Sequence, residues 1–194
     1  MKLKSLPCAV VALSMLLAFA GTASATTLEV KGVKQTGAVT LKATLKAGNS
    51  MLLADTSGSF AINTCTASTI EGTTTTVTGA TVTAPVKVLT FGTCSEAPIT
   101  IDTAGTLTIE RIGTTTNGTV NWSGLKWTWP SAFGVVTCTT PASPGTDIGI
   151  LSGVAAGQAT LEINTVIICG GMFTSMRWTA TYTVTGLEGL AVTS

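Results

Sequence analysis

Polar and apolar residues alternate along most of the chain beyond residue 25. Between residues 176 and 184, every second side chain is apolar: Met176, Trp178, Ala180, Tyr182 and Val184. The same period of two runs through residues 39–46 and through residues 80–88. Strict alternation is typical of strands that have one buried and one solvated face. The pattern therefore predicts an all-β fold.

Turn residues separate these stretches at short intervals. The clearest turn signals are Gly48-Asn49, Ser57-Gly58, Asn117-Gly118, Ser123-Gly124, Pro144-Gly145 and Gly170-Gly171. Asn117-Gly118 is predicted to form a tight hairpin turn. Short antiparallel strands of this kind favour an antiparallel β-sandwich, with a closed β-barrel as the alternative.

The first 25 residues have the three parts of a cleavable signal peptide. Lys2 and Lys4 precede an apolar run at residues 9–20, and small residues follow at positions 21–25. The run is shorter than the roughly 20 residues that a membrane-spanning helix needs. We expect cleavage after Ala25, no integral membrane span, and a single all-β domain at residues 26–194. Its predicted location is extracellular, on the cell surface or in the periplasm.

The expected mature domain is almost electrically neutral. Without Lys2 and Lys4, it keeps eight of the ten Lys and Arg residues, against nine Asp and Glu residues. No run of basic residues is present that could follow a phosphate backbone, so we predict no nucleic-acid partner. The polar positions are rich in threonine, which tolerates a pleated surface well. Rows of threonine on a flat sheet could order water or ice, but ordinary solvated strand faces are favoured because sheets twist.

Four cysteines remain after cleavage: Cys65, Cys94, Cys138 and Cys169. An even number in an exported chain indicates disulfides, and four cysteines allow three pairings. We predict pairing in chain order, because each disulfide then closes a local loop and is worth roughly 3–4 kcal/mol in the chain-entropy model. The chain contains no histidine and no CxxC sequence, so a zinc site is a poor alternative.

The residue types argue against catalysis. Without histidine, neither a Ser-His-Asp nor a Cys-His mechanism is available. The carboxylates are scattered singly along the chain, so their spacing does not predict the facing pair that a glycosidase uses. We expect a non-enzymatic protein with no cofactor and no metal ion. A secreted hydrolase is the function that we favour least.

The tryptophans allow two interpretations. Trp127 and Trp129 are two positions apart, so they share one face of a strand, and Trp122 lies just before the preceding turn. Exposed, these side chains could stack on sugar rings or anchor a partner. Buried, they would form part of the core, which is the favoured interpretation for Trp122 and Trp178. For Trp127 and Trp129 both interpretations stay open.

Much of the chain resembles a group of secreted, β-rich bacterial proteins that have no established activity. The matching segments are residues 55–60, 64–66, 68–72, 89–91, 105–107, 117–119, 133–135, 137–138, 146–149, 159–161 and 178–185. The resemblance implies export and a β-rich fold, whereas Trp122 and the segment 126–129 are unusual against the pattern. The chain is more distantly similar to secreted activators of alkane oxidation.

These observations lead to one main functional prediction. We expect a secreted or cell-surface structural protein of the adhesion type, with self-association or a surface or matrix component as its partner. Long threonine-lined strands offer stable surfaces, and an unprotected strand edge could pair with another subunit. The first alternative is an extracellular module that binds carbohydrate or an apolar ligand through Trp127 and Trp129.

Overall fold

The described part of the chain consists of β-strands joined by turns and loops. A computed structural model describes residues 25–132 and 134–194, which contain sixteen strands and no helix. Residues 1–24 of the predicted signal peptide (residues 1–25) lie outside the described residues. The strands are β1 (Thr26–Val30), β2 (Val33–Lys34), β3 (Thr40–Leu45), β4 (Met51–Ala54), β5 (Ala61–Thr73), β6 (Thr78–Gly79), β7 (Val82–Cys94), β8 (Thr100–Thr103), β9 (Thr106–Arg111), β10 (Gly118–Ser123), β11 (Lys126–Ser131), β12 (Gly134–Thr139), β13 (Thr146–Ser152), β14 (Gln158–Gly170), β15 (Ser175–Glu188) and β16 (Leu190–Thr193).

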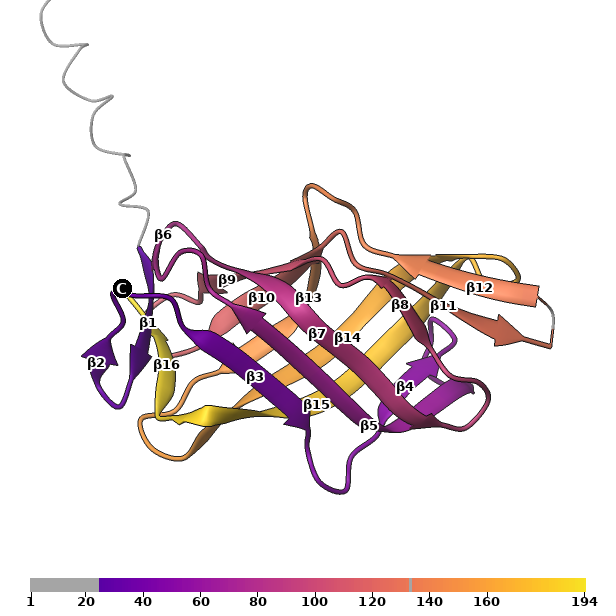
Figure 1. The fold of residues 1–194 in the computed structure, drawn as a ribbon, viewed down its shortest axis with the longest axis horizontal. Coiled ribbons are helices and arrows are strands. Elements are labelled where there is room, and N and C mark those ends of the chain that lie inside the picture. Colours follow the sequence, from indigo (N-terminus) through magenta and orange to yellow (C-terminus); the bar gives the residue numbers. More distant parts are fainter. Residues whose placement is uncertain (1–24, 133) are drawn as a thin grey trace, which may run out of the picture.

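Eight of these strands form a closed antiparallel barrel (Figure 1). The order around the ring is β3, β5, β7, β9, β10, β13, β14 and β15, and β15 pairs again with β3. The all-β fold and the two disulfides are confirmed, and the barrel replaces the sandwich that we preferred. Alternating strands suit both architectures, because each gives a strand one buried and one solvated face. The sequence does not reveal that β3 pairs with both β5 and β15.

The barrel interior is filled by the protein's own side chains. Along β15 the side chains alternate between buried and partly exposed positions, as predicted. In one half of the barrel, aliphatic side chains and a glycine from all eight strands surround a cavity of only about 40 Å³. A pocket for a drug-sized ligand usually needs roughly 300 Å³ or more. This cavity is therefore too small for such a ligand.

A small second sheet covers one end of the barrel. It contains β1, β2, β6 and β16, and the described chain begins and ends in it (Figure 1). Leu28, Leu190 and Val192 of this sheet are completely buried and belong to the same hydrophobic core as the barrel. Val192 also donates its backbone N–H to the carbonyl of Thr116 at 2.9 Å, which fixes the sheet to the β9–β10 connection. We call this the capped end.

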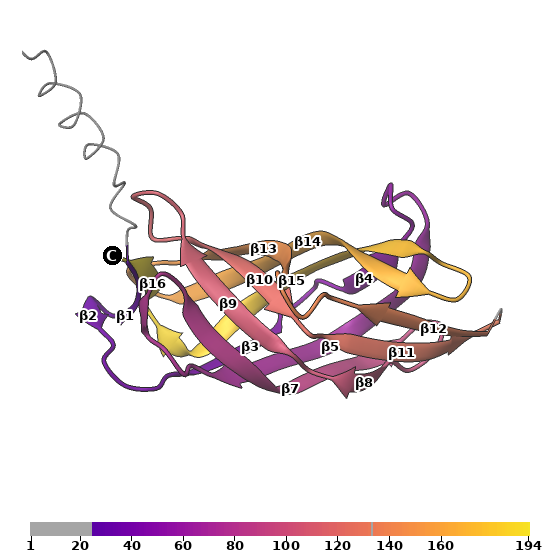
Figure 2. The same ribbon diagram turned by 90° about the horizontal axis from the view of Figure 1, so that it is seen from above.

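The wall is incomplete toward the opposite end. There β4 takes the place of β3 between β5 and β15, and β12, β11 and β8 extend the sheet from β14. The sheet stops at β8, and no backbone pairing joins β8 to β7 in the described chain. Figure 2 shows β8, β11 and β12 together at the end away from β1 and β16. We call this part of the barrel the open half.

Both disulfides lie in the open half, and both pair in chain order as predicted. Cys65 on β5 joins Cys94 on β7, and Cys138 on β12 joins Cys169 on β14. In each case the two cysteines are directly opposite in the strand register, with Cα atoms 3.9 Å apart. Covalent links thus reinforce the strands where the ring of backbone hydrogen bonds is interrupted.

Strand β7 departs from the predicted alternation at Val88. This side chain was expected to be buried, but it is 38% exposed, whereas Leu89 is buried. The β5–β7 register shifts between Glu71 and Gly72 and skips Lys87. One extra residue in a strand is a β-bulge, and it exchanges the buried and solvated faces beyond that point.

Asn117-Gly118 does not form the predicted tight turn. The β9–β10 hairpin is real, but its loop spans residues 112–117, and Gly118 is the first residue of β10. The loop closes with the Ile112 N–H donating to the Asn117 carbonyl at 3.0 Å. Gly118 is required within the strand, because a Cβ there would lie 2.7 Å from Cγ2 of Ile109.

Candidate functional site

The three tryptophans proposed as ligand contacts are buried. Trp122 is 0% exposed, and Trp127 and Trp129 are each 1% exposed. Trp122 donates its indole N–H to the Ala104 carbonyl at 2.7 Å. An aromatic side chain needs an exposed face to stack on a sugar ring. In this conformation, Trp122 and Trp127 contribute to the core and offer no such face.

Trp127 and Trp178 form the centre of an aromatic cluster in the open half. Their ring centroids are 5.1 Å apart at an interplanar angle of 81°. Phe91 meets both rings edge-on, at 5.8 Å and 6.1 Å. Neither Trp127 nor Trp178 has a hydrogen-bond partner for its buried indole nitrogen among the described residues. Edge-to-face contacts of this kind are favourable because the positive edge of one ring meets the negative face of another.

Exposed apolar side chains gather at the end of the molecule opposite the capped end. Phe60, Pro130 and Phe173 line a hollow of about 280 Å³, which Trp129 also lines. Val135 is directly opposite Pro130 in the β11–β12 register and therefore shares its face. Met172 lies beside Phe173 in the β14–β15 turn. We call these five side chains, Phe60, Pro130, Val135, Met172 and Phe173, the apolar end.

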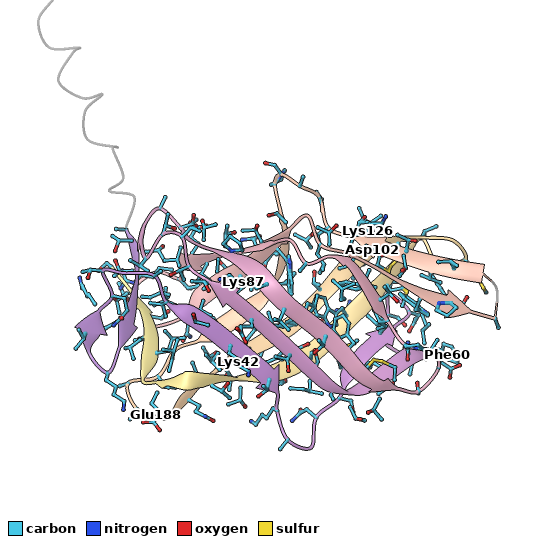
Figure 3. All side chains as sticks on the ribbon, in the orientation of Figure 1. Lys42, Phe60, Lys87, Asp102, Lys126 and Glu188 are labelled. Atoms are coloured by element: carbon cyan, nitrogen blue, oxygen red, sulfur yellow. A yellow bond between two sulfur atoms is a disulfide. The ribbon has the colours of Figure 1, made fainter. Side chains whose placement is uncertain are left out.

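Three of the five side chains of the apolar end are unusually accessible for their type. Phe60 is 69% exposed, Val135 is 63% exposed and Met172 is 55% exposed. Figure 3 shows Phe60 in the half of the molecule away from the capped end. Exposed apolar groups that cluster together mark interaction surfaces, whereas single exposed apolar side chains are common everywhere. The apolar end is therefore the candidate functional site.

A hydrogen-bonded turn holds Phe60 in place. The Asp55 carboxylate accepts hydrogen bonds from the Ser57 hydroxyl and from the Phe60 backbone N–H, the latter at 2.7 Å. The Asp55 N–H in turn donates to the Phe60 carbonyl at 3.0 Å. The bond from Ser57, followed by that from Phe60, lowers the pKa of Asp55 below its usual value. The Asp55 carboxylate thus stabilises the conformation of the β4–β5 loop.

Tyr182 is the titratable group whose environment is most unusual. Its phenol is buried within the barrel and lies 2.9 Å from the Ser68 hydroxyl. Ser68 uses its one hydroxyl proton to donate to the Thr90 carbonyl at 2.8 Å, so Tyr182 is the donor to Ser68. Burial raises the pKa of Tyr182 far above its usual value, and the bond to Ser68 opposes this only in part. The phenol has no access to a substrate and acts in packing.

Within residues 25–132 and 134–194, no three His, Cys, Asp or Glu side chains are grouped so that they could hold a metal ion. The same residues include no helix that is long and apolar enough to cross a membrane.

The fold defines a class: a disulfide-linked, eight-stranded antiparallel barrel with one capped end. Disulfides persist in oxidising compartments, which indicates a location outside the cytoplasm. No protein-family model, no curated protein and no solved structure matches the chain.

Sequence reasoning passed over the apolar end, although a signal for it exists. Phe60 follows the turn signal at Ser57-Gly58, and Met172 and Phe173 directly follow Gly170-Gly171. A large apolar side chain next to a turn is out of place, because turns lie on the surface. The alternation in the flanking strands indicates only which side chains are buried in the core.

Proposed function

We propose that this protein is an exported, non-enzymatic adhesion-type protein that self-associates or attaches to a surface or matrix through its apolar end. The observation that carries the proposal is the hollow that Phe60, Pro130 and Phe173 line together, with Val135 directly opposite Pro130 in the strand register. Phe60, Val135 and Met172 are each more than half exposed. Aromatic side chains and methionine are enriched at protein interfaces. Water contact with these side chains is unfavourable, and a partner surface would remove it.

The chemistry of the hollow favours an uncharged, apolar contact. Among the residues that line it, Glu96 is the only charged one. No lysine or arginine lies there to attract phosphate groups or anionic lipid headgroups. A second copy of the protein, or an apolar matrix component, fits this lining better than a nucleic acid or an anionic membrane.

The non-enzymatic part of the proposal is supported by the residue types. The chain has no histidine, so the general base most often used near neutral pH is missing. The interior cavity of about 40 Å³ is too small for a substrate of ordinary size. Purified mature protein should therefore turn over no substrate in panels of esters, glycosides and peptides.

The experiment compares the mature protein with a double variant, F60S/M172S. Light scattering behind size-exclusion chromatography would measure self-association, and washing of producing cells would measure retention at the surface. Wild-type protein should self-associate or stay with the cells, and the double variant should lose this property. The matched control is Val33→Ser, because Val33 is also 63% exposed but lies on β2 at the capped end.

Three results would contradict the proposal. One is a wild-type protein that is a freely diffusing monomer and washes away. Another is a double variant that associates as well as the wild type. The third is measurable turnover of any substrate class by the purified protein.

A further inference from the structure

A polar groove crosses the outer wall of the barrel over β10, β13, β14 and β15. It consists of two adjoining hollows of about 430 Å³ and 290 Å³, which share Glu162 and Asn164 as lining residues. The other polar side chains that line it are Asn49, Ser50, Thr119, Asp147, Thr179 and Thr181. We call it the wall groove, and it shares no residue with the apolar end.

A bulge in β13 shapes the wall groove. The β10–β13 register passes from Gly149 to Asp147 in one step of β10, so Ile148 turns into the core while Asp147 is exposed. At Gly149 the backbone φ is +151°, and a Cβ would lie 1.8 Å from the Glu162 carbonyl oxygen. Asp147 Oδ1 accepts the Gly149 N–H at 3.1 Å, and the Thr165 hydroxyl donates to the Asp147 carbonyl at 2.8 Å. The Asp147 carboxylate is therefore held in position at the groove.

The two carboxylates in the wall groove have no ion-pair partner within the described residues. The ion pairs Lys31–Glu188 and Lys126–Asp102 involve no residue that lines the groove, and Figure 3 labels both residues of the second pair. Neither Asp147 nor Glu162 takes part, and no lysine or arginine lines the groove.

The guanidinium of Arg177 is hydrogen-bonded to a side chain that lines the groove. Arg177 donates from Nη1 to Asn164 Oδ1 at 2.8 Å and from Nε to the Thr56 carbonyl at 3.0 Å. With its oxygen occupied, the Asn164 amide presents its N–H groups as donors. Carboxylates only accept hydrogen bonds. The groove therefore suits a ligand that offers positive charge together with both donors and acceptors.

A row of hydroxyl side chains runs beside the wall groove. It crosses adjacent strands in register: Ser152, Thr160, Thr183, Thr44, Thr69 and Thr90. Thr160 and Glu162 lie two residues apart on β14 and share its outer face. The row thus lengthens the polar surface of the groove, and hydroxyl groups both donate and accept hydrogen bonds. Such a surface matches an extended chain that is itself rich in hydroxyl groups.

We propose that the wall groove binds polysaccharide chains that carry free amino groups. The ammonium groups pair with Asp147 and Glu162, while the sugar hydroxyls bond to the threonine hydroxyls and the Asn164 amide. Ile150, which is 43% exposed in the same hollow, offers an apolar contact for the C–H face of a sugar ring. This activity goes beyond adhesion through the apolar end and uses a separate surface.

Titration calorimetry of the mature protein tests the inference with three probes: a glucosamine oligosaccharide, its fully N-acetylated counterpart and Ca²⁺ alone. The glucosamine oligosaccharide should bind, and acetylation should weaken binding because it removes the positive charge. Glu162→Gln and Asp147→Asn keep the side-chain shapes, and each should lower the affinity about tenfold, as expected for losing a charged hydrogen bond. Glu29→Gln, which removes a charge from β1 in the small sheet at the capped end, is the control and should bind like the wild type.

Several outcomes would overturn the inference. They are equal binding of both oligosaccharides, binding of Ca²⁺ without either oligosaccharide, no binding at all, or full affinity in Glu162→Gln and Asp147→Asn. Circular dichroism of each variant would verify that it is folded. The F60S/M172S variant should keep its oligosaccharide binding, so failure of the apolar-end proposal and failure of this one are distinguishable.

Discussion

Trp127 on β11 meets Trp178 on β15 edge-to-face, with ring centroids 5.1 Å apart. The two strands are not paired with each other in the sheet, and β11 belongs to the extension that stops at β8. Packing between these two rings therefore joins strands that share no backbone hydrogen bonds. Phe91 on β7 also meets Trp127 edge-on, with ring centroids 5.8 Å apart, so aromatic packing connects β7 to this extension where the described chain has no backbone pairing between β7 and β8.

Replacing Trp127 by alanine should destabilise the protein severely. Truncating a buried Trp typically costs about 3–5 kcal/mol, since packing is lost and a cavity remains. Trp127→Phe keeps an aromatic ring and should cost less. Urea unfolding followed by far-ultraviolet circular dichroism would measure both. The exposed control Val33→Ala should stay within roughly 0.5 kcal/mol of the wild type, and a Trp127→Ala protein as stable as this control would contradict the assigned role.

Removing either disulfide should loosen the open half before the rest of the barrel. Loss of a native disulfide typically costs about 2–5 kcal/mol in a small secreted domain. We expect C138S/C169S to increase amide hydrogen exchange first in β8, β11 and β12, because these strands are not part of the closed ring of hydrogen-bonded strands. Exchange in β3 and β15 should remain slow, since both belong to that ring. Mass spectrometry of exchanged peptides would measure this, and uniform acceleration across all strands would contradict it.

Tyr182 should resist ionisation until the protein unfolds. It is the single tyrosine of the chain, so phenolate absorbance reports on it alone. Burial, partly opposed by the bond to Ser68, raises its pKa in the folded state above the usual value of 10.0. A raised pKa means that its contribution to stability is complete below pH 10 and is lost as the pH rises further. An ultraviolet titration should show phenolate appearing together with unfolding, and ionisation near pH 10 in a fully folded protein would refute the burial argument.

Ser68→Ala should cost more stability than Tyr182→Phe. In the alanine variant, the buried Tyr182 hydroxyl loses its acceptor, and an unsatisfied buried polar group costs about 1–3 kcal/mol. In the phenylalanine variant, Ser68 still donates to the Thr90 carbonyl, so the loss should be near 1 kcal/mol. Urea midpoints of the two variants, measured side by side, decide the matter. The reverse order would mean that Tyr182 donates to a group other than Ser68.

The sequence predicts strands and disulfides well because both depend on local patterns. The alternation from Met176 to Val184 is reproduced in β15, and both cysteine pairs join as expected. Barrel closure was only the alternative, since it depends on β3 pairing with β15 across nearly the whole chain. The bulge at Lys87 could not be predicted, because an extra residue in a strand does not change the composition of the segment.

The candidate sites were harder to predict than the fold. Trp127 and Trp129 were predicted as candidates because tryptophan is a residue type that binds ligands. Their exposure depends on which face of β11 turns inward, and alternation alone does not determine that face. Glu162 and Asp147 lie fifteen positions apart in the chain, and only the β13–β14 pairing and the bulge at Gly149 bring them to one groove. Phe60 and Phe173 line one hollow although they come from two separate loops, 113 positions apart in the chain.

The pairing of β1 with β16 has a consequence for the order in which the protein can fold during synthesis. The Thr193 hydroxyl donates to the Glu29 carboxylate across a separation of 164 residues, and neighbouring residues of the two strands are in register. A nascent chain emerges from its N-terminus, so β1 has to wait until β16 has been made before it finds this partner. The capped end can therefore close only after Leu190–Thr193 has been synthesised, and a chain that is cut before Leu190 leaves the interior uncovered at this end.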